Sequence, residues 1–103
     1  MLKTNVEIDN ITRQFIKIYN PHKLILFGSQ AKNKSTAKSD IDLCIITKTD
    51  NKRTVLADMY LNIECDKPFD LLLYTPDEWE RSVTDHTSFA YRINKEGVVL
   101  HGW

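Results

Sequence analysis

The sequence predicts one α/β (α+β) domain, with helices flanking a small mixed β-sheet. Three observations support this fold class. Short apolar runs of strand length alternate along the chain with segments whose apolar residues have helical spacing. The 103 residues are the size of one domain, and we expect a single domain over residues 1–103. The composition, 42% hydrophobic and 27% charged, is that of an ordinary globular chain that can bury a core.

The first half of the chain contains one clear helix and two clear strands. Apolar residues recur every three or four positions over 6–19, which predicts a helix, and Asn-Pro follows it directly. Residues 23–27 form an apolar run typical of a buried strand. Ser29 could cap a short helical turn over 30–32. A second strand is predicted over 41–47, after a polar loop.

The second half predicts three helices and two strands. A helix over 51–64 has one apolar face, and a turn separates it from a strand over 69–74. A threonine, a proline and a glutamate then mark the start of a helix over 76–83. Another helix is expected over 88–96, where a glycine stops it. A short strand over 98–100 follows.

Charge and composition exclude several classes of protein. Lys+Arg and Asp+Glu number 14 each, so the net charge is zero and nucleic acid is not expected as the main ligand. The polar residues 1–7 lack a signal-peptide core, and no apolar run has the length of a membrane span. We therefore expect a cytoplasmic protein that does not enter a membrane. Cys44 and Cys65 have no CxxC partner that would indicate zinc.

Two carboxylates interrupt the second predicted strand. Asp40 and Asp42 alternate with apolar residues, so they share one face of the strand and lie about 7 Å apart at Cα. Asp70 is the only charge in the next strand and can join them if the two strands pair. Like charges this close need a cation. Mg²⁺ prefers carboxylate oxygens, and three acids could hold two metal ions for nucleotidyl displacement.

Each acid also has a simpler interpretation when it is taken alone. Asp40 follows a serine and suits a turn, and Asp70 could be an acid at the edge of a sheet. Glu64 and Asp66 compete with Asp70 as the third acid, although they fall at a helix end and in a turn. Taken together, the three acids favour a metal site.

A glycine and a serine follow the first predicted strand. Gly28 lets a phosphate approach the backbone, and Ser29 offers a hydroxyl donor at the start of a helical turn. Lys32 and Lys38 could then meet the charge of a triphosphate, although a solvated loop is an equally good interpretation of each lysine. The pair predicts a phosphate-binding turn facing the acids.

Together these residues resemble the polymerase-β-like nucleotidyltransferase superfamily. The pattern is Gly28-Ser29, ten residues, Asp40-x-Asp42, and later Phe69-Asp70-Leu71, with a closing KEGVVLHG. The resemblance implies that fold, metal binding by the three acids, and triphosphate binding by the Gly-Ser pair. It also implies transfer of a nucleoside monophosphate from ATP or another NTP. Many relatives have arginine at Gln30 and glycine at Asn33, which puts rate and nucleotide preference in question.

The chain is similar in particular to the minimal nucleotidyltransferases (MNT) of bacteria and archaea. That resemblance implies a HEPN-domain protein as partner, with this chain as the antitoxin that adenylylates a hydroxyl of the toxin. The alternative is a weak or inactive module that neutralises its partner by binding alone. An oligomer is possible. Trp79 and Trp103 could stack on a base, but packing on a helix or at an interface is favoured.

Overall fold

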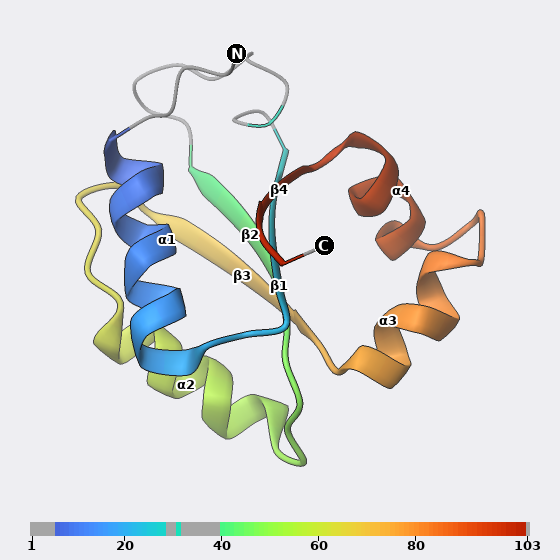
Figure 1. Cartoon of the computed structure of the whole chain (residues 1–103), viewed down its shortest axis with the longest axis horizontal. Coiled ribbons are helices and arrows are strands. Elements are labelled where there is room, and N and C mark those ends of the chain that lie inside the picture. The colour runs from blue at the N-terminus through green and yellow to red at the C-terminus, as the bar shows by residue number, and fades with distance from the viewer. Residues whose placement is uncertain (1–5, 29–30, 32–39, 103) are drawn as a thin grey trace.

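The protein has a four-stranded sheet with helices on both faces (Figure 1). A computed structural model describes residues 6–28, 31 and 40–102. The elements are α1 (Val6–Tyr19), β1 (Lys23–Phe27), β2 (Ile41–Ile46), α2 (Lys52–Asn62), β3 (Phe69–Tyr74), α3 (Pro76–Val83), α4 (Phe89–Glu96) and β4 (Val98–His101). This order confirms the predicted α/β class. Of the predicted turn over 30–32, only Ala31 is described, and it lies in a turn. None of the described helices has the length and apolar character needed to cross a lipid bilayer.

The sheet is mixed, as expected, and its strand order is β3-β2-β1-β4. β1 pairs antiparallel with both β2 and β4, whereas β2 pairs parallel with β3. A parallel pair needs a crossover connection, and the segment containing α2 provides it. β2 therefore has a hydrogen-bonded neighbour on each side.

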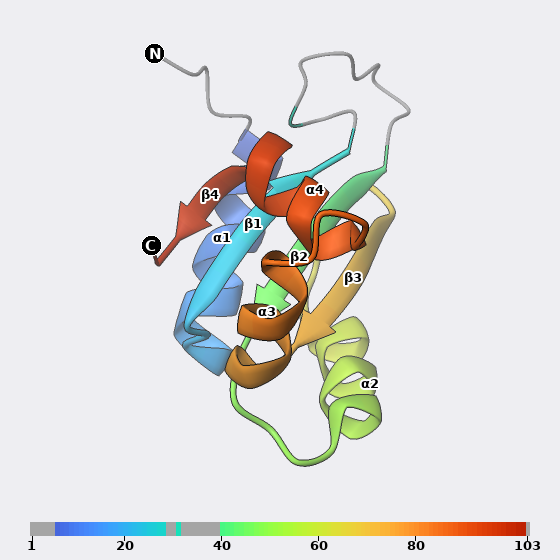
Figure 2. The ribbon, with the colours of Figure 1, turned by 90° about the vertical axis from the view of Figure 1, so that its right-hand side faces the viewer.

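The two faces of the sheet are covered by different helices. Figures 1 and 2 show α1 and α2 on one face and α3 and α4 on the other. Strand residues alternate between the two faces, so β1, β2 and β3 contribute to both cores, whereas Val98 and Leu100 of β4 pack on the α1/α2 core. The α1/α2 core is the larger and consists of Ile8, Ile11, Phe15, Leu24, Leu26, Ile41, Leu43, Ile45, Met59, Ile63, Leu71 and Leu73. The α3/α4 core consists of Ile25, Cys44, Ile46, Trp79, Ala90 and Ile93.

Two helix ends differ in detail from the predicted ones. Asn51 is the N-cap of α2, its side chain accepting a hydrogen bond from the Thr54 amide, and the helix ends at Asn62 rather than at residue 64. α4 ends before Gly97 as predicted, but Gly97 has extended backbone at φ −77° rather than a left-handed turn. Its missing side chain matters instead, because a Cβ there would lie 2.6 Å from both Ile25 Cγ2 and the Ile93 carbonyl oxygen.

The start of α3 has the capping box that the sequence predicts. The Thr75 hydroxyl accepts a hydrogen bond from the Glu78 amide, and the Glu78 carboxylate accepts one from the Thr75 amide. The Lys52 ammonium lies 3.0 Å from the same carboxylate and links α2 to α3. These hydrogen bonds, from Thr75 first and then from Lys52, lower the pKa of Glu78.

Thr75→Ala is expected to lower the free energy of unfolding by about 1 kcal/mol, the usual contribution of an N-cap side chain. The change removes the acceptor for the Glu78 amide. Urea unfolding measures the loss, and Thr54→Ala, at an exposed position of α2 that is not a cap, is the control. Equal stability of Thr75→Ala and the wild type would show that the capping box does not contribute.

Candidate active site

One row of side chains crosses the α3/α4 face at one end of the sheet. Asp42 of β2 is the register partner of Phe27 in β1 and of Asp70 in β3. Directly paired residues point to the same face, and neighbouring strands lie about 4.8 Å apart. The pairing that the sequence analysis required of Asp42 and Asp70 is therefore present, and their side chains leave the sheet together.

Asp40 belongs to this region, although it precedes β2 by one residue and is exposed. The amide of Ile41 donates a 3.0 Å hydrogen bond to the Pro68 carbonyl, which fixes the start of β2 beside the start of β3. The Asp40 charge acts on Asp42. Asp40 and Asp70 are thus both within electrostatic reach of Asp42.

Asp42 lies in an environment that disfavours its negative charge. Burial raises the pKa of Asp42, and the negative charges of Asp70 and then of Asp40 raise it further. A buried carboxylate beside like charges is destabilised in its ionised form. Cys44 lies two residues further along the same face of β2. Burial raises the pKa of its thiol to about 12, so Cys44 is an unreactive core residue.

The predicted three-acid metal site is not preassembled. Among residues 6–28, 31 and 40–102, no three His, Cys, Asp or Glu side chains are grouped so that they could hold a metal ion. The residues nevertheless fit a hard cation, because they offer carboxylate oxygens only and repel one another without one. Metal ligation by Asp40, Asp42 and Asp70 remains a prediction.

Gly28 contacts the acids more closely than the sequence analysis anticipated. Its φ of +76° is a left-handed conformation, and a Cβ built there would overlap the Asp42 carboxylate. Glycine is therefore required both for the backbone turn and for the space that Asp42 occupies. From the sequence, only the approach of a phosphate was predicted for this residue.

The rest of the predicted phosphate-binding turn lies outside the described residues. This applies to Ser29, Lys32 and Lys38, and also to Gln30 and Asn33. Their roles remain predictions.

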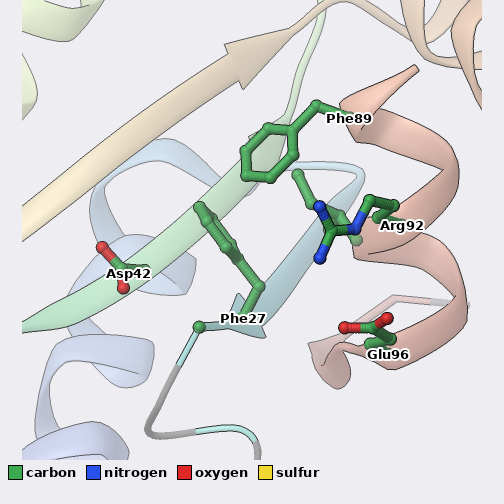
Figure 3. A pocket seen from close by; sticks show the side chains of 7 residues that line it. Phe27, Asp42, Phe89, Arg92 and Glu96 are labelled. Carbon is green, nitrogen blue, oxygen red and sulfur yellow. The ribbon is translucent and has the colours of Figure 1, made fainter. Parts of the chain in front are cut away.

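A cleft of about 280 Å³ opens beside Asp42. Figure 3 shows its two walls: Phe27 and Asp42 come from the sheet, and Phe89, Arg92 and Glu96 from α4. Gly28 also lines the cleft, so the cleft is continuous with the acid row. The α4 residues of this cleft were not predicted from the sequence. The sequence feature that could have indicated them is one helix face with an aromatic residue, a cation and an acid at positions i, i+3 and i+7.

Trp79, considered as a base-stacking residue, belongs to the core. It is 7% exposed, and its ring meets Tyr74 edge-on with centroids 5.3 Å apart. Packing, the favoured interpretation, is therefore confirmed for Trp79. Trp103 lies outside the described residues.

Comparison with known proteins identifies the family. A family model described as "Polymerase beta, Nucleotidyltransferase" matches residues 9–102. The chain belongs to the polymerase beta nucleotidyltransferase family. A comparison with curated protein sequences found no match.

A solved structure supports the fold of this nucleotidyltransferase chain. It is the crystal structure of a "putative nucleotidyltransferase" from Sulfolobus solfataricus, 18% identical, with a TM-score of 0.51. The match covers 99% of this chain and 92% of the other. The polymerase-β-like fold is thereby confirmed, and members of the family generally use Mg²⁺ and a nucleoside triphosphate.

Asp42→Asn is expected to stabilise this chain at neutral pH without metal. As the pH rises through the ordinary value of 3.8, the unfolded chain loses its Asp42 proton before the folded chain does. Ionisation of Asp42 therefore opposes folding above that pH and has no effect below it. Thermal unfolding in chelator should show a higher midpoint for the variant at about pH 7 and none of this gain at about pH 3.

Asp50→Asn, which changes an exposed acid before α2, is the matched control and should leave the midpoint unchanged. A less stable Asp42→Asn at neutral pH would mean that the ionised Asp42 makes favourable native contacts.

Gly28→Ala is expected to lower the free energy of unfolding by about 1–2 kcal/mol, the penalty of a left-handed conformation for an L-residue. It should also displace the Asp42 carboxylate, whose space the new Cβ enters. Urea unfolding of Gly28→Ala, Asp42→Ala and the double variant separates the two effects. The share of the lost unfolding free energy that comes from the clash with Asp42 should disappear when Asp42 is alanine. If the losses of the two single variants simply add up in the double variant, the clash does not contribute.

Proposed function

We propose that this chain is a Mg²⁺-dependent nucleotidyltransferase that moves AMP from ATP to a hydroxyl of a protein partner. The observation that carries the proposal is the placement of Asp42 beside Asp70, with Gly28 against Asp42, in a chain of a nucleotidyltransferase family. Carboxylate oxygens that repel one another are suited to bind Mg²⁺, and a triphosphate binds the same cation.

Each acid has a role in this reaction. Asp40, Asp42 and Asp70 would hold Mg²⁺, which when bound neutralises the acids and the triphosphate. The acceptor oxygen forms a bond to the α-phosphorus, and the bond from that phosphorus to the pyrophosphate oxygen breaks. Pyrophosphate leaves with the electron pair, and Asp70 takes the proton of the attacking hydroxyl. The backbone at Gly28, extended by Ser29, holds the triphosphate, with Lys32 and Lys38 as further cations.

The proposed partner is a HEPN-domain toxin, with this chain as its antitoxin. The support is the similarity of the Gly-Ser and Asp-x-Asp pattern to minimal nucleotidyltransferases. Attachment of AMP to a toxin hydroxyl adds bulk and negative charge, which would block the toxin's own site.

A module that neutralises its partner by binding alone is the second candidate. The observation that favours it is the lack of a preassembled three-residue metal group among the described residues. Retention of all three acids favours the enzyme.

Intact mass spectrometry tests the proposal. The chain is incubated with ATP, Mg²⁺ and the protein encoded beside it, which we expect to be a HEPN-domain toxin, and this partner should gain one AMP. Asp40→Asn and Asp42→Asn should each reduce the rate by at least about 100-fold, more than residues that only orient metal ligands. Asp50→Asn is the control, because this acid lies in an exposed bend outside the acid row.

Removal of the metal by a chelator should stop the transfer, and Mg²⁺ should restore it. Transfer by Asp40→Asn and Asp42→Asn at the wild-type rate would disprove the enzymatic role. Neutralisation of the toxin with no gain in mass would establish the binding module.

A further inference from the structure

The cleft between the sheet and α4 has no role yet in the proposed reaction. It is continuous with the acid row, since Gly28 and Asp42 line it together with the α4 residues. Its volume of about 280 Å³ is near the lower end of small-molecule pockets. A cleft of this size can hold one flat group next to the reacting phosphates.

An exposed aromatic ring stands at the mouth of this cleft. Phe89 is 49% exposed, and its ring meets Phe27 edge-on with centroids 5.5 Å apart. Figure 3 shows the Phe89 ring reaching from α4 toward the Phe27 ring. The edge-to-face pair holds the Phe89 ring in place and leaves part of it open to stack on a flat ligand.

The geometry of α4 explains why these side chains face the cleft. Ala90 and Ile93 are 0% and 2% exposed and anchor the helix on the sheet. Phe89 and Arg92, three residues apart, then lie together on the helix face that borders the cleft. In Figure 3 the Arg92 guanidinium extends from α4 toward the Phe27 ring, across the cleft from Asp42. An arginine there suits a phosphate, which it can bind through two parallel hydrogen bonds.

We propose that this cleft binds the nucleoside half of the triphosphate and favours purines. The inference rests on the proposed function. The base stacks on Phe89 against the edge formed by Phe27, and Arg92 binds the phosphate closest to the ribose. An aromatic ring can stack on any base, but the stacking is stronger for a larger base. Purine nucleotides should therefore bind more tightly than pyrimidine nucleotides.

Binding measurements on the full chain without a partner test this assignment. Isothermal titration in Mg²⁺ uses three probes: ATP, UTP and inorganic tripolyphosphate, which has no base. The wild type should bind ATP more tightly than UTP. Phe89→Ala should weaken ATP binding about tenfold and remove the preference over UTP, because one base stack is lost. Its affinity for tripolyphosphate should stay unchanged.

Two further variants make the test specific. Phe89→Leu keeps apolar bulk without an aromatic face and should behave like Phe89→Ala, which separates stacking from any loss of folding. Arg92→Ala should weaken tripolyphosphate and ATP alike. The controls are Ile18→Ala, an apolar residue of α1 that is 50% exposed, and Lys95→Ala, an exposed cation of α4 outside the cleft.

The outcomes separate this inference from the proposed function. If the wild type binds or transfers ATP while Phe89→Ala and Phe89→Leu keep its affinity and its base preference, the nucleoside assignment is wrong and the reaction stands. Equal losses for ATP and tripolyphosphate in the Phe89 variants would also overturn it. If the wild type neither binds nor transfers ATP, the proposed function itself fails.

Discussion

The parallel pairing of β2 with β3 is the constraint on which the active site depends. Its register places Asp42 next to Asp70, and it places Leu43 next to Leu71 on the opposite face. A slip of one residue by either strand would reverse the faces of that strand and exchange its acid for a leucine in the core. The hydrophobic pattern that builds the α1/α2 core therefore also sets the position of the carboxylates.

This constraint places like charges side by side, which opposes folding. Burial and the two neighbouring charges raise the pKa of Asp42, whereas Asp40 and Asp70 remain exposed. The repulsion is limited because the acids lie at one end of the sheet, beyond the buried residues Cys44 and Ile46 of the same face. Solvent can then screen the two outer acids. Carboxylates placed deeper under α3 and α4 would lose their contact with water, and their burial would destabilise the fold more strongly.

The elements and the acids could be predicted from the sequence because their signals are local. Period-two alternation placed Asp42 on the face opposite to Leu43 and Ile45, and Thr75, Pro76 and Glu78 marked the start of α3 correctly. The pairing of Asp42 with Asp70 required one further assumption, that the two strands are neighbours, and the structure confirms it. The grouping of all three acids around a metal stays a prediction, since Asp40 precedes the strand and strand alternation does not fix its side chain.

The α4 wall of the cleft could not be predicted because it depends on contacts between distant segments. Phe89 and Arg92 become part of the site only when α4 lies across the end of β1. Gly97 allows this, since a side chain there would collide with Ile25 of β1. The chain then continues directly into β4, which pairs with β1.

The position of α4 is thus fixed twice, by its buried side and by the strand that follows it. Ala90 and Ile93 pack on the sheet, and β4 hydrogen-bonds to the strand that forms the other wall of the cleft. Phe27 and Gly28, which line the sheet wall of the cleft, lie at the end of that same strand. β1 thus forms one wall of the cleft and, through its pairing with β4, holds the end of α4 that forms the other wall. The sheet therefore sets the spacing between the acid row and the Phe89 ring.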